Sequence, residues 1–452
     1  MKGLSRQKAG SADNSQRGAF VSVEKGSVAR RPLFFYGWVI VGIAIIGMML
    51  VYGTRHSFSV FFPPILDEFG WSRGSTALML SLNILIYGLT APIAGSLCDR
   101  WKPHRVVLIG ATVLGLATAG CAFASELWHF YLLFGFLMPI GTAFSGWPLL
   151  GPTLVNWFAK RRGMVMGLAQ VGGGLSFTYG MFVEFVIAQV GWRHTYFVIA
   201  GIVIAVLVPL YFFFYHYRPE KKGLKPYGAD DQWIPVELNG STAEDQKSVP
   251  GGWTLRKALR TYQLWFMLAS QSLYWGVGAY MVLGHQVKFA EDIGYSSTFA
   301  ASVFALFGIF VAVGQLSAGL SDWIGREKTV TLAVILALGA LTALISVRDT
   351  SQPWLLYLYA ICFGYGAGLC APTIYAGLAD IFHGRNFGVL SGLLMTGFGI
   401  GGIIGPWLGG FIYDVTGSYT NAFLLAMMCF ALSGITFWIA APRKAEKLRA
   451  QL

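Results

Sequence analysis

Two adjacent ionisable side chains, Arg55 and His56, stand at the end of the first long apolar run of the chain. A guanidinium can hold a carboxylate through two parallel hydrogen bonds. An imidazole, with an unperturbed pKa of about 6.5, can exchange a proton near neutral pH. An ionised residue within an apolar membrane segment costs about 2.5–3.5 kcal/mol, so its presence needs a reason. The chemistry predicted for this pair is the binding of an organic anion, with a proton as a second ligand of His56.

The position of the pair follows from helix geometry. At a rise of 1.5 Å per residue, Arg55 lies about 29 Å along a helix that starts near Tyr36, in the outer part of the run. Neighbouring residues point about 100° apart, so Arg55 and His56 are expected on different faces. The alternatives are an arginine that extends to the membrane surface and a neutral histidine at the interface.

Two further ionisable residues occur in apolar surroundings, and both have structural alternatives. His285 ends the seventh apolar run, and by the repeat described below it is expected to face Arg55 across a cavity. Glu184 is an acid within an apolar run away from the connectors, and burial would let it carry a coupling proton. The alternatives are an interfacial histidine and a glutamate paired with a neighbouring helix.

Polar and aromatic residues near the middle of the runs complete a predicted pocket. Asn83 and Tyr87 are one helical turn apart and share a face. Aromatic walls with a few polar groups suit an amphipathic organic anion, although each residue alone is more often packing. The further predicted binding residues are Trp147, Tyr179, Tyr280, Gln315 and Tyr365.

The elements that must position these residues are membrane helices. The chain has 452 residues, of which 55% are hydrophobic and 12% charged, against about 25% charged in soluble proteins. The sequence predicts an all-α integral membrane protein with twelve spans, each near the roughly 20 residues that a bilayer requires. The predicted spans are 35–56, 76–97, 106–124, 129–153, 164–190, 195–215, 263–285, 298–320, 329–347, 354–378, 387–412 and 420–441.

One long polar segment divides the spans into six and six. The predicted parts are a tail over 1–33, a six-helix bundle over 34–217, a linker over 218–260, a second bundle over 261–441 and a tail over 442–452. Of the 33 Lys and Arg residues, 28 fall on the side of the two tails and 4 on the other side. This bias predicts that both termini are cytoplasmic. Because the positive charges sit in short connectors and tails, the net charge of +12 does not indicate nucleic acid.

The two halves repeat each other. Asp67-Glu68-Phe69-Gly70-Trp71-Ser72 after span 1 matches Glu291-Asp292-Ile293-Gly294-Tyr295-Ser296 after span 7, at an offset of 224 residues. Asp99 matches Asp322 at 223, and Gly191 matches Gly417 at 226. Near-constant offsets indicate a parallel repeat. In such proteins two bundles rock about a central site.

The loop Gly95-Ser96-Leu97-Cys98-Asp99-Arg100 and its second copy, Leu320-Ser321-Asp322-Trp323-Ile324-Gly325-Arg326, resemble the loop between spans 2 and 3 of major facilitator superfamily transporters. In the first copy, Lys102 replaces the inner glycine of that motif. We expect Asp99 and Asp322 to pair with Arg161 and Arg385 and to latch the cytoplasmic side. Arg100 and Arg326 complete this predicted gate. The alternative is a set of solvated loop charges that contribute little.

Span 5 is similar to the monocarboxylate-porter group of that superfamily, which includes oxalate–formate exchangers. The matching residues are Phe158, Lys160, Arg161, Arg162, Gly167, Ala169 and Gly172. His56 stands where the group commonly has a lysine. Proton-coupled members place an Asp and an Arg on span 8, where this chain has neither, and Gln315 takes the arginine position. The lysine of span 11 in oxalate exchangers is also absent.

The sequence therefore predicts a secondary active carrier of small organic anions, mainly carboxylates, with proton coupling or exchange and a monomeric functional unit in the cell membrane. The first alternative is an efflux carrier of neutral or drug-like amphiphiles, and the second is a solute sensor that does not transport. The sequence has no nucleophile–base pair, nucleotide loop or metal-ligand spacing, including around its five cysteines. It predicts no enzyme activity, no cofactor and no metal.

Overall fold

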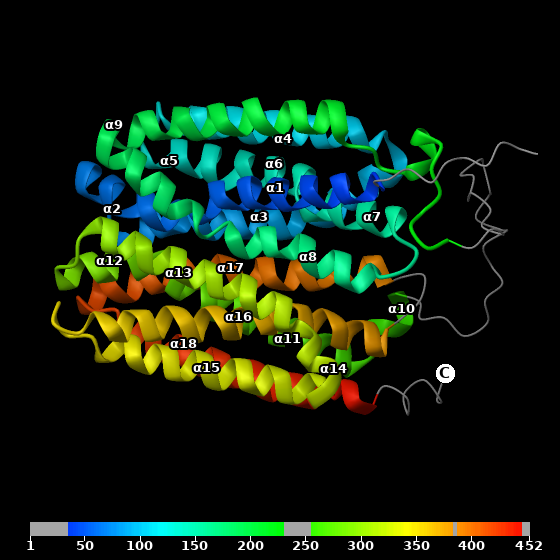
Figure 1. The fold of residues 1–452 in the computed structure, drawn as a ribbon. Helices are drawn as coiled ribbons and strands as arrows, with labels where there is room; N and C mark the ends of the chain where they lie inside the picture. Colours follow the sequence, from blue (N-terminus) through cyan, green and yellow to red (C-terminus); the bar gives the residue numbers. More distant parts are fainter. Residues whose placement is uncertain (1–34, 230–254, 383–386, 445–452) are drawn as a thin grey trace, which may run out of the picture. The chain divides into compact units, whose positions relative to one another are not determined.

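The computed structural model describes residues 35–229, 255–382 and 387–444, and apart from an isolated bridge between Phe158 and Tyr227 all its regular structure is helical. The helices of the first half run from Gly37 to Phe214 (Figure 1). They are α1 (Gly37–His56), α2 (Phe58–Phe69), α3 (Arg73–Arg100), α4 (Pro103–Cys121), α5 (Leu127–Phe130), η1 (Tyr131–Leu137), α6 (Met138–Ser145), α7 (Trp147–Trp157), α8 (Arg162–Leu175), α9 (Tyr179–Ile202), η2 (Val203–Leu207) and η3 (Leu210–Phe214).

The second half follows the short helix η4 (Pro219–Lys222). Its helices are α10 (Leu255–Ala258), α11 (Tyr262–Gln271), η5 (Ser272–Ala279), α12 (Tyr280–Ile293), α13 (Ser297–Leu316), η6 (Ser317–Gly319), α14 (Leu320–Ile324), α15 (Arg326–Ser346), α16 (Pro353–Ile381), α17 (Phe387–Thr416), α18 (Thr420–Ala440) and η7 (Pro442–Lys444).

The helices are long and apolar enough for twelve membrane crossings. Ten stretches of the described residues qualify by length and composition, and one of them, Gly163–Phe214, has 52 residues and holds two crossings that meet at Gly191. The consecutive helices α11, η5 and α12 supply the remaining crossing. Only helices and closed barrels satisfy their backbone hydrogen bonds in lipid, so a run of apolar segments folds in this way.

Span 4 breaks at Gly146, between α6 and α7, where φ and ψ are −102° and −150°. At Ser57, between α1 and α2, and at Ser176 and Thr178, between α8 and α9, the backbone keeps helical φ and ψ and only the hydrogen-bond pattern is irregular. Breaks at membrane depth are tolerated where other protein groups satisfy the released backbone groups.

The repeated sequence motif forms the same turn in both halves. Gly70, after α2, and Gly294, after α12, both have positive φ, at 65° and 109°. Ser72 and Ser296 then cap the next helices by accepting hydrogen bonds from the backbone N–H groups of Ser75 and Phe299. A left-handed glycine ends a helix without strain, and a serine N-cap satisfies an unpaired N–H group of the next one.

Four helix pairs of the described chain bring the halves together. They are α3 with α17, α8 with α13, α2 with α12 and α9 with α13. Small residues allow the approach of α3 to α17 and that of α8 to α13, because a Cβ atom on Gly88 would lie 2.8 Å from the Cα atom of Gly399, and one on Gly174 would lie 2.6 Å from the backbone nitrogen of Ala312.

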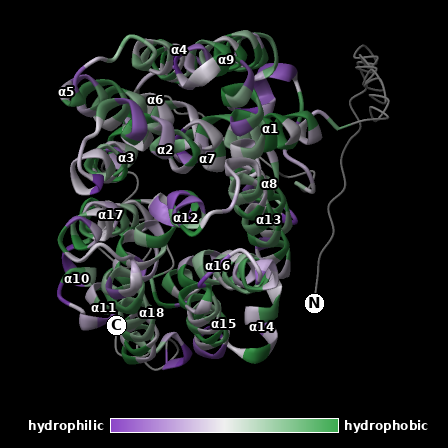
Figure 2. Ribbon diagram, turned by 90° about the vertical axis from the view of Figure 1, so that its left-hand side faces the viewer, coloured by the Kyte–Doolittle hydropathy of each residue, from purple (hydrophilic) through white to green (hydrophobic). Residues whose placement is uncertain are grey.

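We name the two ends of this helical unit by its connectors. The distal end is where α2 and α12 end and α3 and α13 begin, and the linker end carries α10 and α14 (Figure 1). Figure 2 views the distal end, where hydrophilic colour on α12 lies between the helices of the two halves.

Candidate functional site

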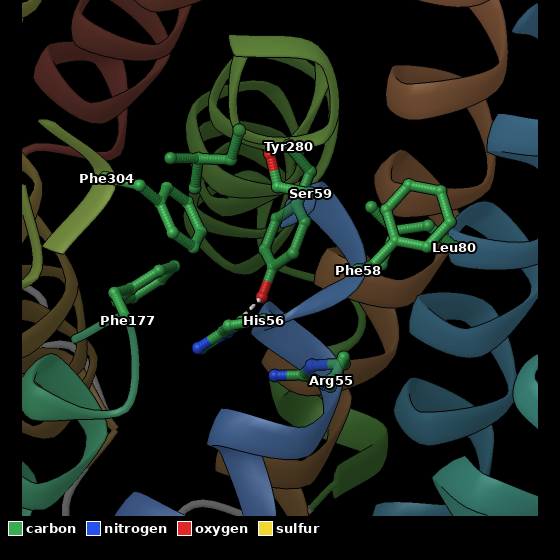
Figure 3. Close-up of a pocket in the computed structure, with 9 residues that line it drawn as sticks. Arg55, His56, Phe58, Ser59, Leu80, Phe177, Tyr280 and Phe304 are labelled. Atoms are coloured by element: carbon green, nitrogen blue, oxygen red, sulfur yellow. Dashed lines mark hydrogen bonds between the residues drawn. The ribbon is translucent and has the colours of Figure 1, made fainter. Parts of the chain in front are cut away.

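Arg55 lies in a pocket between the halves and has donors without acceptors. Its exposed fraction is 4%, and its Nε and Nη1 atoms have no hydrogen-bond partner among the described residues. The guanidinium lies within hydrogen-bonding reach of the Tyr280 hydroxyl. The pocket is narrow, with a cavity volume of about 10 Å³ (Figure 3), and its lining residues are Arg55, His56, Phe58, Ser59, Leu80, Phe177, Tyr280, Leu283 and Phe304. No acidic residue of the described chain belongs to this lining.

Three aromatic rings surround the guanidinium. The Cζ atom of Arg55 is 5.0 Å from the ring centroid of Tyr52, 4.9 Å from that of Tyr87 and 5.9 Å from that of Tyr280. A ring face attracts a cation within about 6 Å, which partly offsets the cost of burying an unpaired charge. The rings supply no hydrogen-bond acceptors to the two unpartnered donors, so these donors remain available to an anion.

His56 belongs to the same pocket and is held from both sides. Its Nδ1 atom is 2.7 Å from the Ser176 hydroxyl, and its Nε2 atom is 2.9 Å from the Tyr280 hydroxyl (Figure 3). The Ser176 hydroxyl donates to the Gly173 carbonyl, so it accepts from Nδ1–H, and Tyr280 donates to Nε2. The Phe177 ring stacks on the imidazole at a centroid distance of 3.8 Å. The side chain of His56 is therefore fixed.

Arg55 and His56 are expected on different faces of their helix, yet both line the pocket. The pocket surrounds the end of α1, where the helix stops at His56 and α2 begins at Phe58. Two faces of one helix end can then reach the same space.

A tyrosine pair supports the inner wall. The Tyr52 and Tyr87 hydroxyls are 2.7 Å apart, and the backbone N–H group of Trp147 donates to Tyr52 at 3.3 Å. Trp147 is the first residue of α7, after the break at Gly146, so its N–H group has no acceptor within the helix. Tyr52 therefore joins α1 and α3 to the broken helix of span 4.

Seven predicted binding residues lie outside this pocket lining, namely Asn83, Tyr87, Trp147, Tyr179, His285, Gln315 and Tyr365. Asn83 donates its side-chain amide to the Phe134 carbonyl at 2.7 Å, and Tyr179 packs against Gly53. The side-chain oxygen of Gln315 has no partner in the described chain, and it faces Gly174 of the first half. Tyr365 is half-buried on α16, where its backbone lies against Gly314. The structure thus brings together Arg55, His56 and Tyr280, with Tyr87 and Trp147 linked through Tyr52.

His285 does not face Arg55. It is fully buried, its Nε2–H group donates to the Pro406 carbonyl at 2.8 Å, and its Nδ1 atom is 3.3 Å from the Tyr419 hydroxyl. Its ring lies edge-on to Phe62 of α2. His285 therefore belongs to the packing of α12 against α17 near the distal end, while Tyr280, more than one turn earlier on α12, reaches the pocket.

The predicted gate is described only in part. Arg385 and the side chains of Asp99 and Arg100 lie outside the described residues. Asp322 accepts from Arg326 at 2.6 Å, and Arg326 also bonds Asp380 at 2.8 Å, so this second copy connects α14, α15 and α16. Arg161 is exposed and has a φ of 63° at the start of α8.

Sequence reasoning missed six of the nine lining residues, namely Phe58, Ser59, Leu80, Phe177, Leu283 and Phe304, and it also missed the supporting residues Tyr52 and Ser176. Tyr52 stands three residues before Arg55, on the same helical face, and this spacing could have identified it. Ser176 and Phe177 follow the glycine triplet of span 5, where the apolar pattern predicted an unbroken helix. Both residues contact His56, and hydropathy carries no sign of these contacts.

The sequence of the chain matches one family model and several curated proteins. The model is that of the Major Facilitator Superfamily, over residues 44–376 and 336–451. Human monocarboxylate transporter 11 is 29% identical over 419 residues, which cover 90% of this chain and 83% of that protein. Monocarboxylate transporter 13 of Rattus norvegicus is 25% identical over 413 residues, covering 90% and 89%. Monocarboxylate transporter 2 of Mesocricetus auratus is 25% identical over 435 residues, covering 92% and 87%.

Solved structures share the fold. A bacterial homologue of the human lysosomal transporter Spinster, in an inward-facing and occupied conformation, matches with a TM-score of 0.64 and 14% identity. The match covers 92% of this chain and 97% of that one. The same homologue in an unoccupied conformation gives 0.63. At this identity the similarity concerns the fold, with two bundles of six membrane helices.

Proposed function

Because the chain belongs to the major facilitator superfamily, we propose that it is a secondary active carrier of small organic anions, mainly carboxylates, that works by alternating access. The supporting observation is a buried guanidinium, that of Arg55, with two unpartnered donors in a pocket without an acidic residue among the described ones. A bound carboxylate would supply both the missing acceptors and the missing charge. The names of the relatives indicate the same class of substrate.

The same pocket offers a reason for a preference among carboxylates. Phe58, Phe177 and Phe304 line it together with Leu80 and Leu283, so the space beside Arg55 is apolar. An anion with a short apolar or planar part would place its carboxylate on Arg55 and its body against these side chains. The aromatic lining also suits a neutral amphiphile, which is the second candidate, but such a ligand would leave the guanidinium unpaired.

The proposal includes an orientation. The tails and the linker carry most of the positive charge, so we place the linker end in the cytoplasm and the distal end outside, in the cell membrane. Lysine and arginine residues that flank membrane crossings keep their end of the protein on the cytoplasmic side. The proposed functional unit is a monomer, and the nine lining residues of this pocket lie within one chain.

Pairs of ligands that differ in charge alone test the substrate class. Lactate and benzoate should raise the melting temperature of the purified protein, whereas lactamide and benzamide should not. Arg55→Gln should weaken carboxylate binding by about 100-fold, because two hydrogen bonds to a charged donor are lost. Uptake of labelled lactate or benzoate into proteoliposomes should fall in parallel.

Two further variants make the test specific. Arg55→Lys keeps the charge but loses the forked geometry, so binding should fall between wild type and Arg55→Gln. Arg348→Gln removes an exposed arginine outside the pocket and should bind as wild type does. Equal responses to the acids and their amides would favour the neutral amphiphile. A ligand response without any flux in proteoliposomes would instead favour the sensor.

A further inference from the structure

A groove opens between α15 and α18 at the edge of the second half. The two helices lie side by side there (Figure 1 and Figure 2). The groove has a volume of about 490 Å³, against about 10 Å³ for the pocket at Arg55. Its lining residues are Thr331, Val334, Ala431, Gly434, Ile435, Trp438, Ile439 and Arg443. All of them belong to the second half, so the groove is separate from the pocket between the halves.

The walls of the groove are apolar and lie within two membrane crossings, Arg326–Ser346 and Thr420–Lys444. Ile435 and Ile439 of α18 have exposed fractions of 56% and 42%, so the groove is open to the surroundings of the helices. From Ala431 to Ile439 the helix rises about 12 Å, most of the roughly 15 Å hydrocarbon depth of one leaflet. The groove therefore has the length and the lining that suit one acyl chain.

The linker end of the groove carries a cation over an aromatic ring. Arg443 lies in η7, directly after α18, and its Cζ atom is 4.5 Å from the centroid of the Trp438 ring. The Trp438 Nε1–H group donates to the Thr331 hydroxyl at 2.8 Å, which fixes the ring between α18 and α15. A tryptophan with its N–H group bonded and its ring in the apolar wall is typical of the level where headgroups begin.

The charge of Arg443 is compensated only in part. Its Nη1 atom donates to the Glu327 carboxylate at 3.4 Å, and the guanidinium makes no other hydrogen bond within the described part of the chain. Its side chain is 45% exposed. Lys328, three residues before Thr331 on α15, and Lys444 are also exposed. Three cations and one acid therefore stand at this end of the groove, with donors left for an anion.

We propose that the groove binds one anionic glycerophospholipid from the leaflet at the linker end, with an acyl chain between α15 and α18 and the phosphate on Arg443. The apolar walls accept the chain, and the excess of positive charge selects the headgroup. A zwitterionic lipid also has a phosphate, but its own cation weakens the attraction to Arg443, Lys328 and Lys444. The site does not rest on the substrate proposed for the Arg55 pocket.

Photo-crosslinking with lipids that differ in headgroup alone tests the site. The full chain is placed in phosphatidylcholine nanodiscs with a trace of phosphatidylglycerol or phosphatidylcholine that carries a diazirine on one acyl chain, and the labelled peptides are measured by mass spectrometry. Residues 427–440 should be labelled about tenfold more by phosphatidylglycerol than by phosphatidylcholine, because hydrogen bonds to a charged group and nearby cations favour the anionic lipid.

An ordinary lipid-facing surface of the same protein provides the internal reference. Residues 106–116 lie in the linker-side half of α4 and include Ile109 and Leu116, which are 47% and 61% exposed. Arg105 lies just before them and is exposed, so this surface also attracts anionic lipid in a general way. Its labelling should favour phosphatidylglycerol by about twofold at most, and the excess at 427–440 measures the groove.

Variants separate the headgroup contact from the groove. Arg443→Gln should reduce the enrichment at 427–440 to the level at 106–116, and Arg443→Lys should keep part of it. Gly434→Leu should reduce labelling by both lipids, because a Cβ atom there meets only ordinary contacts and the added side chain fills the groove. Arg256→Gln removes an exposed arginine of α10 outside the lining and should label as the wild type does. The melting temperature of each variant in detergent shows that it is folded.

Four results would overturn the proposal. The first is an enrichment at 427–440 no greater than that at 106–116 in the wild type, since the groove would then hold ordinary bilayer lipid. The second is an enrichment that persists in Arg443→Gln, and the third is labelling that does not change in Gly434→Leu. The fourth is labelling that disappears when two copies share a nanodisc, which would assign the groove to a second copy of the chain. Arg55→Gln should label as the wild type does, so a failure of the anion site leaves this result intact.

Discussion

Arg55 and Arg73 lie 18 positions apart in the sequence and make opposite uses of the same side chain. The Arg73 guanidinium donates to Asp292 and to the Tyr419 hydroxyl, and its Cζ atom lies 3.6 Å from the centroid of the Tyr413 ring. The Arg55 guanidinium has aromatic neighbours but two donors without acceptors. A satisfied arginine holds helices together, whereas the unsatisfied one is the group to which the proposed function assigns a bound anion. The two arginines differ because Arg73 has the Asp292 carboxylate beside it, whereas no acidic residue of the described chain lines the pocket of Arg55.

Removal of each charge should therefore change stability in opposite directions. Arg73→Gln leaves the Asp292 carboxylate without its main partner, and the loss of one member of a partly buried pair costs about 3 kcal/mol. We expect a clearly lower melting temperature and faster hydrogen exchange at residues 67–76. Arg55→Gln removes a buried charge that has no acid to pair with, so the ligand-free protein should melt at the same temperature or higher.

The double variant Arg73→Gln with Asp292→Asn checks the explanation. It removes both charges of the pair, so it should recover part of the stability that Arg73→Gln loses. Equal destabilisation by Arg55→Gln and Arg73→Gln would contradict the view that Arg73 stabilises the fold through an ion pair and that Arg55 instead binds an anion.

Two histidines extend the comparison with a smaller effect. His56 orients the Tyr280 hydroxyl beside Arg55, whereas His285 bonds the Pro406 carbonyl and Tyr419 near the distal end. His56→Gln should weaken benzoate binding by about tenfold, the equivalent of about one hydrogen bond. His285→Gln should lower the melting temperature and leave benzoate affinity within about twofold of wild type. Isothermal titration of benzoate and thermal unfolding of both variants test this. A loss of benzoate affinity in His285→Gln but not in His56→Gln would assign the binding role to His285 instead.

The sequence predicts the fold and the central cation because a bilayer restricts what an apolar chain can do. Helices follow from hydropathy, and a lone arginine in an apolar run stands out. The contacts of Ser176 and Phe177 with His56 do not follow, since they join residues about 120 positions apart. Contacts such as Arg73 with Asp292 join residues 219 positions apart, and no local pattern indicates them.

The smallest expected effect comes from removing one tyrosine hydroxyl beside each arginine. Tyr52→Phe keeps the ring beside Arg55 but removes the hydroxyl that bonds Tyr87 and accepts from the Trp147 backbone N–H group. One neutral hydrogen bond contributes about 1 kcal/mol, so lactate and benzoate should bind about fivefold more weakly as the wall around Arg55 loosens. Tyr419→Phe removes a hydroxyl from Arg73 instead and should lower the melting temperature with no such loss of affinity. Titration calorimetry resolves a fivefold change. If Tyr52→Phe binds as wild type does, the rings alone hold the guanidinium, and the tyrosine pair belongs to the packing of span 4 and not to the anion site.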